Sequence, residues 1–83
     1  MSYQVEFGLT LQKIRLEQNL SQSELAELSE IDRTFISLLE RGKRQPSLTT
    51  LFQLALALKL NPSDLVAELE NRLRRGRWKR LKS

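Results

Sequence analysis

Four side chains near the middle of the chain have the types and the spacing to recognise an array of hydrogen-bonding groups. Arg33, Thr34 and Ser37 carry hydrogen-bond donors, and Leu38 offers an apolar surface that can contact a methyl group. If these residues lie on one helix, positions 33, 34, 37 and 38 share its outward face. Donors beside a methyl contact suit the edges of base pairs in a DNA major groove. The alternative for Leu38 is a leucine that is merely exposed, which is common on protein surfaces.

The sequence lacks the residues that metal binding, disulfide formation and hydrolytic catalysis usually require. The sequence contains no cysteine and no histidine, so disulfides and thiolate metal sites are excluded and most hydrolytic mechanisms have no nucleophile–base pair. We therefore expect no catalytic residue, no metal, no cofactor and no small-molecule ligand. No leader is evident, since Glu6 interrupts the first residues, and no apolar run approaches the roughly 18 residues of a membrane span. The expected location is the cytoplasm, without membrane contact.

The stretch from residue 21 to residue 42 must position the four side chains, and it predicts two short helices joined by a tight turn. Ser21 is a good N-cap for the first helix, and Glu24 follows at the spacing of a capping box. The apolar residues that we expect on one face of this helix are Leu25, Ala26 and Leu28.

The second helix is predicted to span residues 33–41. Asp32 is a candidate N-cap, and Ile36 and Leu39 follow at helical spacing on the inward face. Gly42 stands where a helix C-terminus needs a residue that tolerates positive φ. Two helices this short bury little surface alone, so flanking helices are required.

This segment resembles the helix-turn-helix of the lambda-repressor and Cro-like (XRE) family. The resemblance covers about residues 5–70, and the run 32–37 is similar to the small controller proteins of restriction–modification systems. The residues that carry it are Leu20-Ser21-Gln22, Leu25-Ala26, Ile31, Ile36, Leu39-Glu40-Arg41-Gly42 and Pro46-Ser47-Leu48. In such proteins the second helix lies in the major groove while the first crosses the backbone. Glu30 departs from the pattern, because the family usually has glycine there; a positive φ at this residue would cost about 1 kcal/mol.

The resemblance also implies roles outside the reading face. Four side chains would contact DNA phosphates, either from the start of the first helix or from the loop after the second: Gln22, Arg41, Lys43 and Arg44. Their alternative is ordinary solvation, with Gln22 a first-turn residue that makes no contact. The family's ion pair would join Arg15 to Glu40; otherwise Arg15 is a solvated surface residue.

Three further helices are expected around the pair. Residues 5–18 should form the first helix, with Phe7, Leu11 and Ile14 facing the core, and residues 48–58 a later one. The later helix is apolar on more than one face, so it is either deeply buried or shared with a partner. A last helix should begin at Pro62. By resemblance it carries a dimer interface, whose alternative is closure of the monomer core: Leu60, Leu65, Val66 and Leu69.

The charge of the chain is unevenly distributed. Seven of the 14 basic residues and none of the 10 acidic ones lie in residues 72–83, so residues 1–71 carry a net charge of −3. We therefore divide the chain into a helix-turn-helix domain, residues 1–71, and a basic tail, residues 72–83. The tail, with Trp78, could grip DNA phosphates, bind RNA, touch an anionic membrane or remain a solvated extension.

Together these features predict an all-α, five-helix, lambda-repressor-like domain that binds double-stranded DNA. The expected protein is a homodimeric transcriptional regulator that reads a pseudo-palindromic operator. The resemblance implies that it also controls its own gene. One alternative is an antitoxin or a phage or plasmid repressor of the same fold. The other is a protein-interaction module that uses the apolar face of the helix at residues 48–58. An enzyme is the least favoured interpretation.

Overall fold

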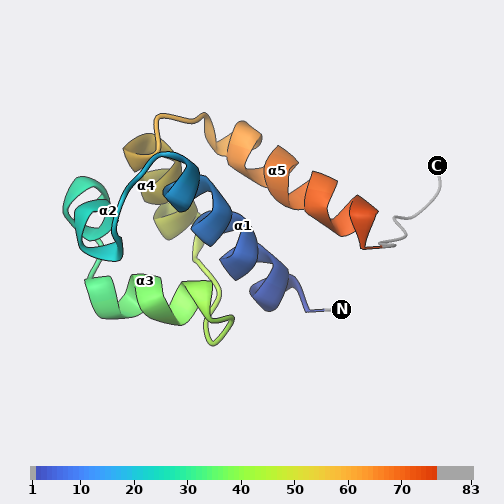
Figure 1. Ribbon diagram of the computed structural model, residues 1–83, viewed down its shortest axis with the longest axis horizontal. Helices are drawn as coiled ribbons and strands as arrows, with labels where there is room; N and C mark the ends of the chain where they lie inside the picture. Colours follow the sequence, from blue (N-terminus) through green and yellow to red (C-terminus); the bar gives the residue numbers. More distant parts are fainter. Residues whose placement is uncertain (1, 77–83) are drawn as a thin grey trace.

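The computed structural model describes residues 2–76, which form five α-helices and no strand. The helices are α1 (Tyr3–Glu17), α2 (Gln22–Ser29), α3 (Arg33–Glu40), α4 (Leu48–Ala57) and α5 (Pro62–Arg75). The predicted all-α, five-helix architecture is confirmed. In Figure 1, α3 lies along the lower edge, α2 and α4 lie at one end, and the start of α1 and the end of α5 lie toward the other. No helix of residues 2–76 is long and apolar enough to cross a membrane.

Short polar residues fix where most helices begin, as the sequence indicated. Ser21 and Glu24 form a complete capping box: the Glu24 N–H donates to Ser21 Oγ at 3.0 Å, and Glu24 Oε1 accepts from the Ser21 N–H at 2.8 Å. Asp32 accepts from the Thr34 N–H at 3.1 Å. The first helix begins two residues earlier than expected, because Ser2 also caps it.

The core lies where α1, α3, α4 and α5 meet, with α2 closing one end. Seven large side chains have no exposed surface: Leu11, Leu25, Ile36, Leu39, Leu54, Leu58 and Leu65. The expected inward face of α1, with Phe7 and Ile14, is confirmed. Leu28 was wrongly assigned to the inward face of α2, since it is 57% exposed while Ser29 is buried in its place.

A close approach between α1 and α3 fixes how α3 is presented. A Cβ atom on Gly8 would overlap the main-chain carbonyl oxygens of Leu39 and Glu40. Only glycine lets α1 lie directly against the last turn of α3. Gly8 has no role among the sequence-based predictions, although an isolated glycine inside a helical pattern is a signal of such packing.

The last helix runs past the predicted boundary between domain and tail. α5 extends to Arg75 with Gly76 as its C-cap, Leu73 is buried, and Arg72 Nε donates to Glu6 Oε1 at 2.8 Å. The basic segment that starts at residue 72 therefore begins within α5, because its first turn completes the helix and bonds to α1. The expectations for Trp78 and its neighbours lie outside the described residues.

Candidate nucleic-acid interface

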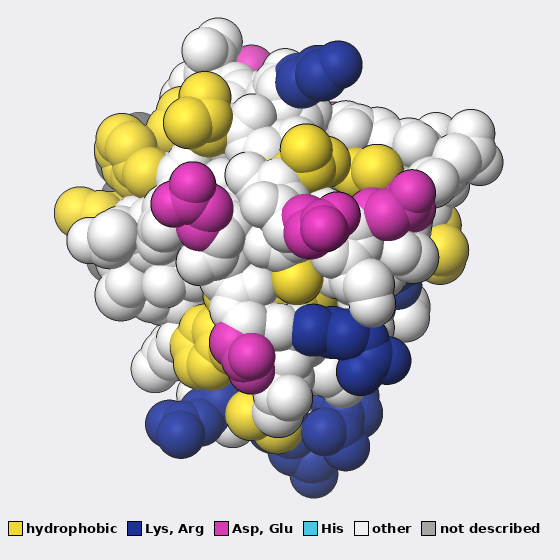
Figure 2. Space-filling view, turned by 90° about the vertical axis from the view of Figure 1, so that its left-hand side faces the viewer, with side chains coloured by type: hydrophobic (Ala, Val, Ile, Leu, Met, Phe, Trp, Pro, Cys, Tyr) yellow, Lys and Arg dark blue, Asp and Glu magenta, His cyan; other side chains and the backbone are white. Residues whose placement is uncertain are grey.

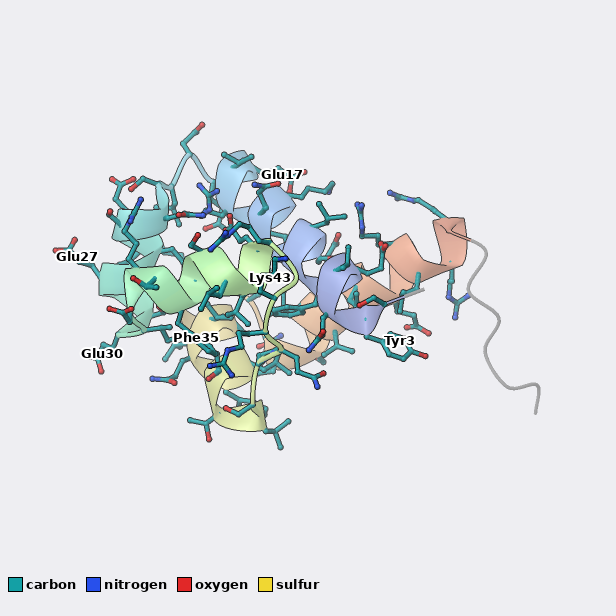
Figure 3. The ribbon with its side chains drawn as sticks, turned by 90° about the horizontal axis from the view of Figure 1, so that it is seen from below. Tyr3, Glu17, Glu27, Glu30, Phe35 and Lys43 are labelled. Atoms are coloured by element: carbon teal, nitrogen blue, oxygen red, sulfur yellow. The ribbon has the colours of Figure 1, made fainter. Side chains whose placement is uncertain are left out.

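The predicted reading face stands at an outer edge of the molecule. Arg33 and Thr34 are exposed on the first turn of α3, and Ser37 one turn later is half-buried. Ile36 and Leu39 on the opposite face are fully buried. Figure 3, drawn from the α3 side, shows this helix nearest the viewer with no other helix across it. The face can therefore approach a partner along most of its length.

Two of the predicted DNA-contacting residues are only partly exposed. Leu38 is half-buried rather than exposed. The following loop turns back at this residue, and the Lys43 N–H donates to the Leu38 carbonyl at 2.9 Å. Gln22 is half-buried as well, and its Nε2 donates to Glu40 Oε1 at 3.0 Å. Phe35 packs against the core.

A buried ion pair ties α1 to the last turn of α3. Arg15 Nε and Nη2 donate to the two carboxylate oxygens of Glu40 at 2.6 and 2.9 Å, the bidentate geometry that guanidinium favours. Arg15 Nη1 also donates to the Leu20 carbonyl at 2.8 Å. These hydrogen bonds to Glu40 raise the pKa of Arg15 above its usual value, although burial opposes the charge. The predicted pair is thus present, and it extends through Gln22 to the start of α2.

The turn between α2 and α3 has the positive φ at Glu30 that the family's glycine at this position suggested. Glu30 has φ +60° and ψ +30°, in the left-handed region that disfavours residues with a Cβ atom. Its N–H still donates to the Ala26 carbonyl, which ends α2 in the usual way. The departure from glycine therefore leaves the turn itself intact.

The loop after α3 brings further cations to the same edge. Gly42 has φ +72°, and a Cβ atom there would lie 2.8 Å from Val5 Cγ2, so α1 supports the turn from behind. Arg41, Lys43 and Arg44 are exposed. Figure 2 shows lysine and arginine side chains gathered at the lower edge, on the side where α3 lies, with aspartate and glutamate side chains above them. Lys43 lies at the C-terminal end of α3 in Figure 3, whereas Glu27 and Glu30 point away at the other end.

The four predicted dimer residues do not form one surface. Leu65 is fully buried inside the monomer, so its assignment to an interface is wrong. Leu60 and Leu69 are half-buried against the core, and only Val66, at 46%, is exposed.

A row of exposed apolar side chains instead runs along α4. Leu48, Phe52 and Leu56 are 73%, 54% and 80% exposed at a spacing of four residues. We call this row, with Leu60 and Pro62 at its end, the α4 stripe. The expectation that α4 is apolar on more than one face is correct.

Comparison with known proteins connects this geometry to a family. A family profile described as Helix-turn-helix matches residues 11–65, which is most of the chain. Control protein C.MunI of Mycoplasma sp is 37% identical over 67 residues, which cover 80% of this chain and 90% of that protein. Control protein C.BamHI of Bacillus amyloliquefaciens is 41% identical over 61 residues, 72% of this chain and 75% of its own length.

Solved structures agree with the sequence relatives. The restriction–modification controller protein C.AhdI from Aeromonas hydrophila is 43% identical and superposes with a TM-score of 0.71 over 74% of this chain and 92% of its own. The controller protein C.Esp1396I, solved as a tetramer in complex with its natural 35 base-pair operator, is 27% identical with a TM-score of 0.83, over 89% and 97%. The chain belongs to the lambda-repressor and Cro-like helix-turn-helix family of DNA-binding transcriptional regulators.

Proposed function

We propose that the protein is a homodimer that binds a pseudo-palindromic operator in the cytoplasm and regulates transcription, its own gene included. One observation carries the proposal: an exposed α3 edge with hydrogen-bond donors on its first turn and three exposed cations at its end. The operator complex of the similar protein C.Esp1396I supports it. The resemblance to restriction–modification control proteins supports the self-regulatory part.

The side chains at this edge divide into two kinds of contact. Arg33, Thr34 and Ser37 would contact base edges, where a long donor at the start of the helix can reach guanine O6 and N7. Leu38 would contribute a thymine methyl contact from its exposed part. Phosphate contacts fix orientation without reading sequence, and they are assigned to Gln22, Arg41, Lys43 and Arg44.

Gln22 would contact a DNA phosphate through the same side-chain amide that donates to Glu40. Its Nε2 has a second hydrogen, and its Oε1 remains available to orient a neighbouring donor. The Arg15–Glu40 pair therefore holds the phosphate-contacting end of α2 and the C-terminal end of α3 at one spacing. A rigid spacing is what a reader of fixed base positions requires.

We assign the dimer interface to the α4 stripe, because Leu65 is buried inside the monomer. Three large apolar side chains more than half exposed in one row form a surface of the kind that marks protein–protein contacts. The stripe begins at Leu48, directly after the cationic loop, so joining two stripes would hold two α3 helices on one side of the dimer. Half-sites would then lie about one helical turn apart, roughly 34 Å.

Selection from random double-stranded DNA tests the proposal as a whole. The protein should retain a two-fold symmetric consensus, whose half-site spacing reports the dimer geometry. Enrichment of no sequence would contradict operator reading and favour the alternative of a module whose α4 stripe holds another protein.

Two substitutions separate the roles of the cations. Arg33→Ala should cost about 1–3 kcal/mol on the selected site and relax base preference at one position of each half-site. Lys43→Ala should weaken specific and nonspecific binding equally and reduce the salt dependence. With three phosphate-contacting cations in each protomer, log K should fall with log salt at a slope of about −5 for the dimer. Equal losses on both kinds of DNA for Arg33→Ala would make Arg33 a phosphate contact.

Sedimentation tests the dimer surface. Leu56→Lys should shift the protein to monomer, because it places a charge at the most exposed position of the α4 stripe. Leu28→Lys is the matched control, since Leu28 is also exposed but lies on α2 outside the stripe. A dimer that survives Leu56→Lys would move the interface to another face, such as the one with Val66.

A further inference from the structure

A second apolar surface lies between α1 and α5, apart from the α4 stripe. Tyr3, Val66, Leu69 and Leu73, with Glu70, line a groove of about 440 Å³, which we call the α5 groove. Tyr3, Val66 and Leu69 also line an adjoining hollow of about 180 Å³ that reaches Phe7, Pro46 and Leu51. The two hollows therefore form one channel along the inner side of α5.

The α5 groove leaves apolar surface in water that dimerisation would not cover. Tyr3 is 59% and Val66 46% exposed. No residue of the groove lines the hollows along α4, which are formed by other residues such as Phe52 and Leu56. Figure 3 shows Tyr3 near the end of the molecule at which α5 finishes, away from Lys43 and the α3 edge. Neither DNA on the α3 edge nor a partner on the α4 stripe would therefore cover this groove.

We propose that residues 77–83 of the same chain occupy the α5 groove, with Trp78 against Tyr3 and Leu73 and with Leu81 toward Val66. The chain leaves α5 at Gly76, one helical turn beyond Leu73, so the segment starts at the mouth of the groove.

The segment is long enough to follow the groove. Seven residues span up to about 25 Å. Val66 lies ten helical positions before Gly76, which is about 15 Å along α5. Gly76 permits the chain reversal, because glycine accepts backbone conformations that other residues avoid.

The composition of the segment matches the lining of the groove. Trp78 and Leu81 are its apolar residues, and Arg77, Lys79, Arg80 and Lys82 carry four positive charges without an acidic residue. Aromatic side chains contribute large buried areas, and the groove presents Tyr3 as an aromatic partner. Glu70, whose carboxylate accepts from Arg74 Nη2 at 3.0 Å, lies in the lining and places a negative charge beside the cations of the segment.

The proposal predicts a spectroscopic signal that the native chain can report. The sequence has one tryptophan and one tyrosine, so Trp78 emission and energy transfer from Tyr3 each describe one site. In the full-length protein without DNA, Trp78 emission should lie at shorter wavelength than in a free peptide of residues 76–83. Quenching by acrylamide should be several-fold weaker than in that peptide. Tyrosine emission should be lost to Trp78 and recovered in Trp78→Phe.

Substitutions in the groove distinguish the proposed contact from its rivals. Val66→Lys should restore peptide-like emission and quenching, because it places a charge on the groove wall at an already exposed position. Leu16→Lys is the matched control, since Leu16 is 57% exposed at the far end of α1, and it should leave the signal unchanged. Circular dichroism of both variants checks that the helices remain.

Three outcomes would overturn the proposal. Emission equal to that of the peptide would show a solvated segment. A signal lost on dilution would place the segment on a second copy of the chain. A blue shift that appears only when double-stranded DNA is added would assign Trp78 to nucleic acid. The measurement needs no operator, so it stands or fails independently of the proposed function.

Discussion

Removal of the carboxylate at Glu40 should be among the most destabilising single changes in the protein. The Arg15 and Glu40 side chains are only 9% and 1% exposed, and two hydrogen bonds of 2.6 and 2.9 Å join them. Glu40→Ala leaves the guanidinium buried without its counter-charge, and breaking such pairs costs about 3–5 kcal/mol. We expect the lower end, about 3 kcal/mol, because Arg15 keeps its hydrogen bond to the Leu20 carbonyl.

The loss expected for Glu40→Ala is a large fraction of the total free energy of unfolding. A chain of 83 residues has a free energy of unfolding of roughly 4–12 kcal/mol. In urea, with a slope of about 1 kcal/mol per molar for a domain this small, the midpoint should fall by about 3 M. Circular dichroism of the helices measures the transition, and DNA binding should fall with the folded fraction.

Two comparisons make the reasoning refutable. Glu17→Ala removes a carboxylate from the same helix as Arg15, where Glu17 and Lys13 pair at 3.0 Å with about half of each side chain exposed, and should cost no more than about 0.5 kcal/mol. The double variant Arg15→Met/Glu40→Leu should be more stable than Glu40→Ala, because it removes both buried charges. A loss below about 1 kcal/mol for Glu40→Ala would mean that the pair behaves like a surface pair and does not hold α3.

Three other substitutions test the backbone and the closure of α5. Gly8→Ala should cost about 1–3 kcal/mol or more, read as a lower thermal midpoint, since its methyl group meets main-chain oxygens of Leu39 and Glu40; an unchanged midpoint would mean that α1 can shift. Glu30→Gly should stabilise by up to about 1 kcal/mol in urea unfolding by relieving a positive φ, and a loss would indicate that chain entropy outweighs that strain. Arg72→Ala should cost about 0.2–1 kcal/mol, as its pair with Glu6 is partly exposed; a cost above 2 kcal/mol would contradict that estimate.

The sequence predicts best what depends on neighbouring residues. A capping box needs only Ser21 and Glu24, so the start of α2 could be placed to the residue. The Asp32 cap and the positive φ at Gly42 are local in the same sense, whereas the positive φ at Glu30 was expected from the family's glycine at that position. The resemblance supplied the Arg15–Glu40 pair, which joins residues 25 positions apart and has no local signal.

The errors arise where tertiary contacts decide which face is buried. Leu28 satisfies the helical spacing of α2 as well as Leu25 does, but α2 packs through Leu25 and Ser29. Leu65 and Val66 are neighbours of similar hydrophobicity, and only the packing of α5 on the core shows that Leu65 faces inward. The change to a basic composition at residue 72 does not mark the end of α5, in which Leu65, Leu69 and Leu73 repeat every four residues.

The charges of the described residues explain how a domain without excess positive charge can present a DNA-binding edge. Residues 2–76 hold ten basic residues and all 10 acidic ones, so their net charge is zero. α2 carries Glu24 and Glu27 with no cation, whereas Lys43 and Arg44 follow α3 with no carboxylate beside them. A polyanion is therefore attracted to one edge and repelled from the neighbouring one, which orients the domain on encounter. In the proposed complex this arrangement would favour docking through α3 over nonspecific adhesion, because the placement of the charges, more than their total, sets the orientation of the domain.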